Sequence, residues 1–399
     1  MRLLARSCLL LALALPALAT TAEPARRPLA EVVDAAVAAS AAQYRWLLPR
    51  VPADALPRTF EHGKLQLAGE AGRDWTRGFF PGSLWFLFEA TGDAAWKDEA
   101  NRRTALLERE RHNRGTHDVG FLLFCSYGQA LRLDPQPGQR EVLLDGAAAL
   151  ASRFVEPVGA TKSWDWGARR GWDCPVIIDN MMNLELLLWA AETEPRHREL
   201  AIRHADTTLR HHFRPDGSTW HVVDYDAKTG AVRAKVTHQG RADDSAWSRG
   251  QAWAIYGYTL MYRFTREARY LEQARRTTEF VMNHPRLPAD KVPYWDFDDP
   301  NIPDAPRDSS AAAIIASALF ELADHVGGAD GARYRAFAEE QVRSLASPAY
   351  LAAVGENGGF ILKHATGNLP RNSEIDTPLN YGDYYFLEAL LRARAAAKR

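Results

Sequence analysis

The sequence predicts an all-α protein with the architecture of an (α/α)6 barrel, a toroid of six inner and six outer helices. Two observations lead to this fold class. Apolar residues recur at the helical spacing of about 3.6 through most of the chain, whereas alternating strand-like runs are rare and short. Helices that are apolar all round alternate with helices that carry one charged face. An open α-solenoid shows the same alternation, so the periodicity leaves that alternative open.

Six apolar segments are the expected inner helices, because a helix that is apolar on every side has to be surrounded by protein. Each is rich in aromatic or small residues. They begin near Phe79 (FFPGSLWFLFEATG), Asp118 (DVGFLLFCSYGQALRL), Ile177 (IIDNMMNLELLLWAAE), Ser248 (SRGQAWAIYGYTLMYRF), Asp308 (DSSAAAIIASALFELAD) and Tyr381 (YGDYYFLEALLRA).

An amphipathic segment precedes each inner one, and these six are the expected outer helices. They span residues 28–48, 93–111, 137–154, 196–213, 267–283 and 332–346. In the fifth, Tyr270, Ala274, Thr278 and Val281 form one stripe, and charged residues cover the remaining surface. This regular alternation predicts a single domain over residues 23–399, although the length alone suggests two or three.

The alternation also predicts where the functional end of the barrel lies. If each inner helix follows an outer one through a hairpin, all six inner helices run parallel and their N-termini meet at one mouth. The residues at these starts include Trp75, Arg77, His117, Asp118, Asp179, Asn180, Arg249, Gln251, Asp308, Ser309, Asn380 and Asp383. Helix capping is the alternative explanation for the acidic and amide residues among them. Capping suits Asp308 better than Asp179, because residues 176–178 already look buried.

A β-hairpin is expected just before the fourth inner helix, with strands at residues 220–225 and 231–236. A long insertion at the mouth of a toroid usually shapes a pocket.

Residues 1–22 are predicted to be a secretory signal peptide. They combine a positive start, the apolar run CLLLALALPALA and a small-x-small pattern at Ala17, Leu18 and Ala19. The run is too short to span a bilayer, and no later segment reads as a membrane helix. We therefore expect an exported, soluble protein in the periplasm of a Gram-negative bacterium.

Composition excludes several classes of function. The 49 Lys and Arg nearly cancel the 50 Asp and Glu, so the basic surplus of a nucleic-acid-binding protein is missing.

Once Cys8 leaves with the signal, Cys125 and Cys174 remain, and we expect buried free thiols rather than a disulfide. His204, His211 and His212 share an outer helix, and we expect them at a solvated surface rather than at a metal site.

Two carboxylates and an unusual number of tryptophans point to carbohydrate chemistry. Several of the 12 Trp lie in loops or at helix starts, where flat aromatic rings suit sugar faces. Asp118 and Asp179 open successive inner helices, so the toroid brings them close together. Such a pair serves glycoside chemistry when one group keeps its proton and the other is ionised. Asp179, with its apolar neighbours, is the better candidate for a raised pKa.

The sequence allows two interpretations of the role of Arg249. Together with Trp253 it could clamp a carboxylated sugar, by a bidentate pair on one side and stacking on the other. Alternatively, it pairs with Asp243 or Asp244.

The motifs HDVGF, IIDNMMNLELLLWAA, RPDGSTWHVV, THQGRADDSAWSRGQAWAIYGY and YGDYYFLEAL together resemble those of the unsaturated glucuronyl hydrolases of glycoside hydrolase family 88. The resemblance runs from about residue 75 to about residue 390. It implies an (α/α)6 barrel, no metal or organic cofactor, and substrates that are lyase products with a 4,5-unsaturated uronate at the non-reducing end. It also implies that Asp179 protonates C4 and helps water to add at C5, and that Asp118 binds substrate and tunes Asp179. Residues implied to line the substrate subsite are Trp75, His117, Trp164, His221, Gln239, Arg249 and Trp253.

The sequence leaves three alternatives to this function. A related family acts on unsaturated rhamnogalacturonan products with the same chemistry, an inverting glycosidase on saturated sugars would use the same two carboxylates, and a sugar-binding toroid would need no catalysis. The Ser-x-x-Ser-x-Lys pattern by which some family members read sulfate is missing here, although Lys363, Arg371 or Ser373 could substitute. The parent polysaccharide, its linkage and the oligomeric state are left undetermined.

Overall fold

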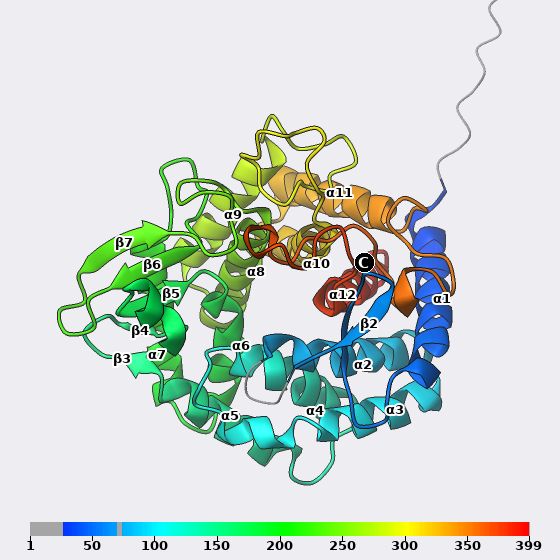
Figure 1. Cartoon of the computed structure of the whole chain (residues 1–399), viewed down its shortest axis with the longest axis horizontal. Helices are drawn as coiled ribbons and strands as arrows, with labels where there is room; N and C mark the ends of the chain where they lie inside the picture. The colour runs from blue at the N-terminus through cyan, green and yellow to red at the C-terminus, as the bar shows by residue number, and fades with distance from the viewer. Residues whose placement is uncertain (1–26, 70–73, 399) are drawn as a thin grey trace, which may run out of the picture.

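The inner helices form a closed ring in the computed structural model, which describes residues 27–69 and 74–398 (Figure 1). Each inner segment packs against the next, and the last, α12, packs against the first, α2. Closure of the ring excludes the open solenoid and confirms the (α/α)6 barrel. The inner segments are α2 (Phe79–Thr91), a π-helix (Gly120–Gly128) that continues as α4 (Gln129–Leu133), α6 (Asn180–Ala190), α8 (Ser248–Thr265), α10 (Ser309–Val326) and α12 (Asn380–Ala396).

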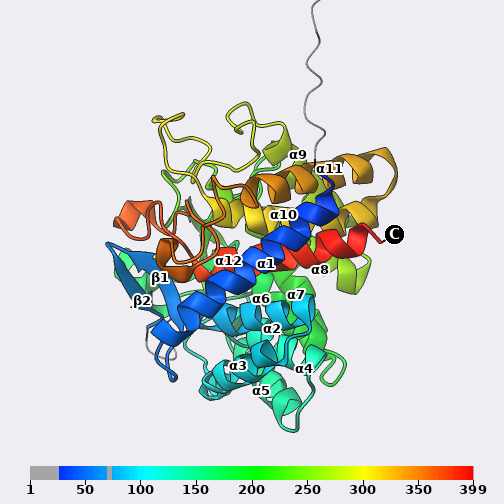
Figure 2. The same ribbon diagram turned by 90° about the vertical axis from the view of Figure 1, so that its right-hand side faces the viewer.

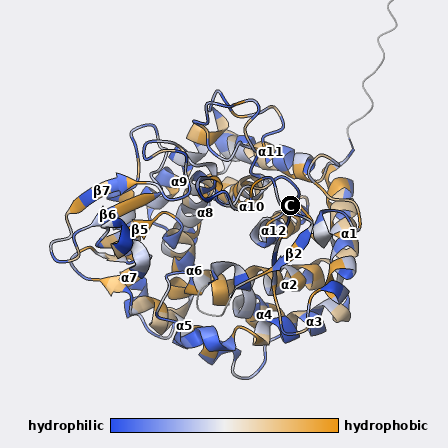
Figure 3. Cartoon of the chain, in the orientation of Figure 1, coloured by the Kyte–Doolittle hydropathy of each residue, from blue (hydrophilic) through white to orange (hydrophobic). Residues whose placement is uncertain are grey.

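The outer helices have the predicted positions and the predicted amphipathic character. In α9 the stripe of Tyr270, Ala274, Thr278 and Val281 is buried, as expected. Figure 3 shows hydrophilic residues along the outer edge of the ring, for example on α5 and α11. The outer helices are α1 (Leu29–Leu47), α3 (Ala94–Ala105), α5 (Gln139–Ala151), α7 (Arg196–His211), α9 (Ala268–Met282) and α11 (Gly328–Leu345).

Glycines allow the inner helices to approach one another closely. A Cβ on Gly120 would lie 2.7 Å from the Cα of Asn183 in α6, and a Cβ on Gly257 would lie 2.5 Å from the Cβ of Met181. Both distances are shorter than a van der Waals contact, so these crossings accept only glycine unless the helices separate. The contact at Gly120 brings the segment that follows Asp118 against the segment that follows Asp179.

One helix in the described part of the chain, α10, is long and apolar enough to cross a membrane by length and composition. Most of α10 is buried inside the ring, as befits a core helix of the barrel.

Short strands supplement the helices in three small sheets. The predicted hairpin is present as β6 (Val222–Tyr225) and β7 (Val232–Val236), but a third strand, β5 (Cys174–Ile177), pairs with β6. The third inner helix therefore begins at Asn180 and not near Ile177, because the apolar run before it forms this strand. The remaining sheets are β1 (Pro57–Glu61) with β2 (Lys64–Leu67), and β3 (Phe154–Val155) with β4 (Ala160–Thr161); neither was predicted.

Short 3-10 helices complete the loops. They are Leu48–Arg50, Trp75–Gly78, Glu108–His112, Asp165–Arg170, Asn357–Gly359 and Leu369–Arg371. Figure 2 shows the β1–β2 hairpin at one end of the barrel and the C-terminus of α12 at the other.

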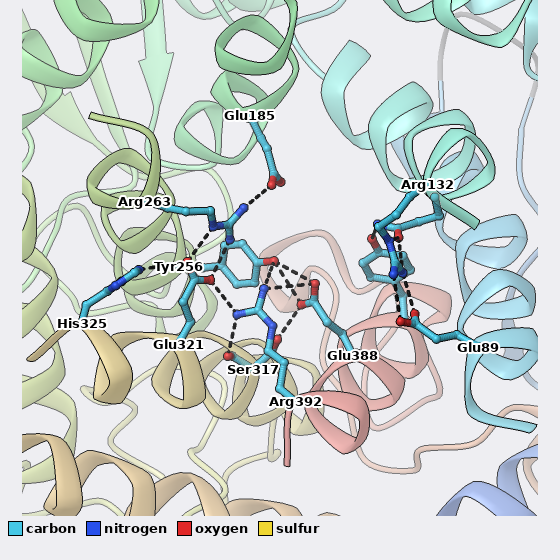
Figure 4. A network of polar contacts seen from close by, with 12 residues as sticks. Glu89, Arg132, Glu185, Tyr256, Arg263, Ser317, Glu321, His325, Glu388 and Arg392 are labelled. Carbon is cyan, nitrogen blue, oxygen red and sulfur yellow. Dashed lines mark hydrogen bonds and ion pairs between the residues drawn. The ribbon is translucent and has the colours of Figure 1, made fainter. Parts of the chain in front are cut away.

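At the C-terminal ends of the inner helices, a network of charged side chains joins α6, α8, α10 and α12 (Figure 4). The guanidinium of Arg263 bonds to Glu185 and Glu321, and that of Arg392 bonds to Glu321 and Glu388. Tyr256 donates to Glu388 at 3.0 Å. The network ties four inner helices together across the end of the barrel that lies away from Asp118 and Asp179.

Cys125 and Cys174 are free and buried, as predicted. The signal-peptide prediction for residues 1–22 falls outside the described residues.

Candidate active site

A cavity of about 1100 Å³ opens at the mouth where the inner helices begin. Four of the predicted site residues line it: Trp75, Asp118, Trp164 and Gln239. The other five predicted residues are not part of this lining: they are Asp179 itself, His117 beside Asp118, and His221, Arg249 and Trp253 near Asp179. A second cavity of about 690 Å³, lined largely by the C-terminal halves of the inner helices, contains none of them.

Asp118 is held by the turn that leads into the π-helix. The hydroxyl of Thr116 donates to Asp118 Oδ2 at 2.9 Å, and the same hydroxyl accepts from the Asp118 amide. His117 is buried, and its Nδ1 bonds to the carbonyl of Ser163 at 3.1 Å. Its Nε2 lies 3.1 Å from Asp118 Oδ1, although the two atoms are not aligned for a hydrogen bond. His117 thus supports Asp118 from behind, and burial lowers the pKa of its imidazole.

Asp179 lies at the junction between β5 and α6. It occupies the N-cap position of α6 but makes no side-chain capping bond, so capping does not explain why an acid stands there. Only 10% of its side chain is exposed. Burial raises the pKa of Asp179 to about 7, the nearby Arg249 opposes this rise, and the charge of Asp118 adds to it. The expected raised pKa is confirmed.

The two carboxylates are linked through the helices that follow them. The amide of Phe121 donates to the side-chain oxygen of Asn183 at 2.9 Å, joining the first turn of the π-helix to the first turn of α6. The electrostatic effect of Asp118 on Asp179 shows that the two groups are within range of each other. The structure therefore brings together the two acids that the sequence predicted as neighbours.

His221 faces Asp179 with a defined protonation state. Its Nδ1 accepts hydrogen bonds from the amides of His238 and Gln239, at 3.1 and 3.2 Å, so the proton of the neutral ring is on Nε2. Burial lowers the pKa of His221 well below its usual range, which keeps the ring neutral at physiological pH. The Nε2–H group lies 3.9 Å from Asp179 Oδ2.

Trp253 lies fully buried beneath Asp179. Its indole N–H and Asp179 Oδ2 both lack a hydrogen bond of ordinary geometry, yet the N–H is close enough to oppose the rise in the pKa of Asp179. The ring packs edge-on against Tyr385 and at a tilt against Phe121, which belong to the aromatic core below the cavity. Trp253 thus forms part of the floor under the carboxylate.

Arg249 pairs with Asp308, not with Asp243 or Asp244. Its Nη1 lies 2.7 Å from Asp308 Oδ2, and both side chains are buried. The guanidinium also donates to the carbonyls of Thr366 and Gly367, and it stacks over the ring of Trp247 at 4.7 Å. Its two terminal nitrogens thus bond to protein groups, whereas its buried Nε has no partner among the described residues. Arg249 links α8 to the loop after α11. Asp308 also caps α10, as expected, by accepting from the amides of Ser310 and Ala311.

The cavity also has lining residues that sequence reasoning did not place there. Trp166 stacks on Trp164, with ring centroids 4.7 Å apart, and the ring of His238 lies 5.0 Å from each. Tyr381, from the start of α12, closes the opposite wall against Trp75 at 4.9 Å. Further lining residues from β1, the 3-10 helices and the loops are Arg58, Arg169, Arg170, Asn368, Arg371 and Glu374. The sequence named only Arg371 among them, as a possible sulfate contact. The one sequence signal for Arg169 and Arg170 is the density of Trp and Arg around residue 168.

The expectation of solvated surface is wrong for His204 and His212. Both are buried: Nδ1 of His204 accepts from the amide of Thr161, and Nε2 of His212 bonds to the carbonyl of Val176. They anchor β4 and β5 against α7, and burial lowers the pKa of each to about 3. Within residues 27–69 and 74–398, no group of three or more His, Cys, Asp or Glu residues is placed to hold a metal ion.

Comparison with known proteins identifies the family to which this chain belongs. A family model described as Glycosyl Hydrolase Family 88 matches residues 52–391. An unsaturated glucuronyl hydrolase from Formosa agariphila is 51% identical over 323 residues, which is 80% of each chain. The crystal structure of an unsaturated glucuronyl hydrolase specific for heparin superimposes with a TM-score of 0.89 and 46% identity, covering 92% of this chain and 98% of that one.

A structure with a bound sugar is also similar. It is an aspartate-to-asparagine variant of the unsaturated glucuronyl hydrolase from Streptococcus agalactiae, complexed with dGlcA-GalNAc6S. It superimposes with a TM-score of 0.79 and 27% identity, covering 92% of this chain and 93% of that one.

Proposed function

This chain belongs to glycosyl hydrolase family 88, and we propose that it removes the 4,5-unsaturated uronic acid from the non-reducing end of oligosaccharides that polysaccharide lyases release. The observation that carries the proposal is the pair of Asp118, which lines the cavity, and Asp179, which lies near it behind the lining and whose pKa is raised to about 7. Similar proteins with this activity act on glycosaminoglycan fragments, such as those of heparin. We propose the same class of substrate here.

The chemistry requires one group to act first as an acid and then as a base. Protonated Asp179 delivers its proton to C4 of the vinyl ether, which leaves a cation shared between C5 and the ring oxygen. Water adds at C5 and gives a proton to the Asp179 carboxylate, so the acid is regenerated. The resulting hemiketal opens as the bond between C5 and the ring oxygen breaks, and the hemiacetal left at C1 then releases the aglycone. A pKa near 7 suits both roles at neutral pH.

The surrounding residues supply orientation rather than further acids. His221 is neutral and presents an N–H group toward Asp179, while Asp118 adds negative charge that favours the protonated form of Asp179. Trp75, Trp164 and Gln239 line the cavity from which a sugar would reach the carboxylates. We assign the remaining predicted residues, His117, Arg249 and Trp253, to holding these groups in place.

Two alternative functions differ in substrate. A hydrolase of unsaturated rhamnogalacturonan products would share the chemistry and differ in aglycone, whereas an inverting glycosidase would act on saturated sugars. The relatives and solved structures named above favour the unsaturated glucuronyl substrate over both.

A panel of lyase-generated disaccharides from heparin, chondroitin, hyaluronan, gellan and ulvan tests the proposal. The enzyme should consume the conjugated alkene, seen as a loss of ultraviolet absorbance, with the highest kcat/KM on one of the glycosaminoglycan disaccharides. A saturated-sugar glycosidase would leave the absorbance unchanged. A sugar-binding protein would bind a disaccharide without consuming it. A rhamnogalacturonan enzyme would consume none of these disaccharides, and a rhamnogalacturonan lyase digest added to the panel would reveal its activity.

We further propose that the protein is exported to the periplasm after removal of residues 1–22. The apolar run and the small-x-small pattern at Ala17 to Ala19 support this. Expression of the full chain in a Gram-negative host, followed by fractionation and N-terminal sequencing, tests it. An unprocessed N-terminus in the cytoplasmic fraction would contradict it.

A further inference from the structure

Three arginines at the rim of the active-site cavity have no carboxylate partner among the described residues. Arg169, Arg170 and Arg371 are exposed and line the cavity. Another lining arginine, Arg58, shows the contrast: it is half-buried and bonds to both Asp74 and Glu374. These three line the space that a substrate would enter.

The acidic residues of the lining do not neutralise this charge. Glu374 is held by Arg58, and Asp165 is held by Arg153 at 3.1 Å. Asp118, the remaining lining acid, lies beside His117 and Thr116. The outer part of the cavity therefore carries an excess of positive charge, although the whole chain has a formal net charge of -1.

The arginines come from two separate 3-10 helices that line the same cavity. Arg169 and Arg170 end the 3-10 helix Asp165–Arg170, and Arg371 ends the 3-10 helix Leu369–Arg371. Arg170 and Arg371 both act on the imidazole of His238, whose pKa is lowered to about 4 by burial and by these two charges. A group bound next to His238 would therefore interact with the positive charges of both Arg170 and Arg371.

An accessible aromatic ring lies between these charges and the catalytic carboxylates. Trp164 contacts His117 and His221, which support Asp118 and face Asp179 respectively. Trp166 stacks on Trp164 nearly in parallel, at 23°, and is 37% exposed, an unusual degree for an indole. The guanidinium of Arg170 lies 6.0 Å from the Trp166 ring. The order from the carboxylates outward is thus Trp164, Trp166 and then the arginines.

We propose that Trp166, Arg169, Arg170 and Arg371 form a subsite for an anionic sugar unit of the aglycone, with a sulfate ester or a carboxylate bound by the arginines. The sugar ring stacks on Trp166 while guanidinium groups make charge-assisted bonds to the anion. The inference rests on the proposed function, because the subsite has a role only if a uronyl oligosaccharide occupies the cavity. It assigns aglycone preference to residues outside the catalytic pair.

Matched substrates test the subsite. One unsaturated uronyl-N-acetylhexosamine disaccharide is compared without sulfate and with one sulfate ester, and an unsulfated tetrasaccharide supplies a carboxylate in the aglycone. The variant carries Arg170→Ala and Arg371→Ala together, with Arg169→Ala added in a second variant. Arg210→Ala, which removes the same charge from the exposed surface of α7, is the control.

The wild-type enzyme should prefer the sulfated disaccharide or the tetrasaccharide over the neutral disaccharide. In the double variant, kcat/KM for the preferred anionic substrate should fall about tenfold, mainly through KM, which corresponds to the loss of charge-assisted bonds. The value for the neutral disaccharide should stay within about twofold, and Arg170→Lys with Arg371→Lys should restore part of the loss. If kcat/KM falls for the sulfated disaccharide alone, the site binds a sulfate ester. If kcat/KM falls for the tetrasaccharide alone, the site binds a carboxylate.

Trp166→Ala gives a second readout, since it should raise KM for every substrate that has an aglycone ring at this position and leave kcat unchanged. Equal losses for neutral and anionic substrates in the arginine variants, or no loss for either, would overturn the subsite. Failure of the proposed function looks different, because then the wild-type enzyme consumes none of the three substrates.

Discussion

The Nε2 atom of His221 lies 3.9 Å from Oδ2 of Asp179, and neither atom has a hydrogen bond within the described structure. Two backbone amides fix the His221 tautomer, so its remaining N–H group points to the acid that is proposed to react. An unpaired donor and an unpaired acceptor this deeply buried normally cost stability. Their presence together at the floor of a cavity marks the place where a ligand or water would complete the bonding.

Asp179→Asn should abolish turnover while the fold is retained. The amide occupies the same volume but cannot deliver a proton to C4, so we expect kcat to fall by at least about 1000-fold. Consumption of the conjugated alkene measures kcat, and circular dichroism with thermal unfolding checks the fold. Asp118→Asn is the matched control and should reduce activity less, since Asp118 tunes its partner. Equal activity of Asp179→Asn and wild type would exclude the assignment.

The pH dependence of the free energy of unfolding should also reveal the protonation state of Asp179. Its folded pKa of about 7 lies above the ordinary value of 3.8, so between these values the folded protein holds a proton that the unfolded chain has released. The free energy of unfolding should therefore decrease as pH rises from about 4 to about 7, by ~4 kcal/mol at most for this one group.

Asp179→Asn removes this contribution, so the variant should gain stability relative to wild type at pH 8 and not at pH 4. Urea unfolding at the two values measures the difference. Asp383, whose pKa burial also raises to about 7, is present in both proteins and cancels in the comparison. Parallel stability curves for the two proteins would show that the carboxyl of Asp179 is not protonated in the folded state.

The pH dependence of activity should respond to Arg249. Its charge opposes the rise in the pKa of Asp179, so removing the charge should raise that pKa further and move the alkaline limit of kcat above its wild-type position near pH 7. Arg249→Met makes this change, and Arg249→Lys keeps the charge while losing part of the bonding to Thr366 and Gly367.

We expect the alkaline limit to move only in Arg249→Met. Both variants should unfold at lower temperature, because a buried ion pair with Asp308 is disturbed, and loss of one partner of such a pair costs ~3–5 kcal/mol. A shift of the same size in both variants would mean that the charge of Arg249 does not set the pKa of Asp179.

The charged network at the far end of the barrel should matter for stability and not for catalysis. Arg392→Met removes the guanidinium that joins Glu321 to Glu388 (Figure 4). Since the side chain is 21% exposed, we expect destabilisation of ~1–3 kcal/mol with kcat and KM unchanged. Urea unfolding and steady-state kinetics on the same preparation give both numbers. A changed KM would connect this end of the barrel to the substrate.

The helical part of the fold was predictable because its signals are local. The spacing of Tyr270, Ala274, Thr278 and Val281 lies within a single helix, and the stripe is buried as expected. Strand β5 was missed because its partner lies far away in the chain: Cys174 pairs with Tyr225, and four apolar residues before a helix give no sign of that contact. For the same reason a helix start was placed three residues early.

The two acids of the site could be predicted from the sequence, whereas the contacts of its other residues were harder to predict. Asp118 and Asp179 were found because both precede inner helices. The partner of Arg249 was missed because Asp308 belongs to another helix, whereas Asp243 and Asp244 are near in sequence. Among the arginines at the rim, Arg371 was named from the sequence as a possible sulfate contact, whereas Arg169 and Arg170 were missed. A sequence does not show which charges are left without partners; only the packing of the loops reveals that.

Ring closure has a consequence for biosynthesis. The last inner helix supplies Tyr381 to the cavity wall, and Asp383 accepts a hydrogen bond from Tyr44 near the other end of the chain. A nascent polypeptide therefore has no complete pocket until nearly all of it has left the ribosome. A premature stop or a proteolytic cut before α12 should leave a fragment that neither closes nor turns over substrate. Circular permutation should be tolerated if the new termini fall in an outer-edge loop and the old ones are joined.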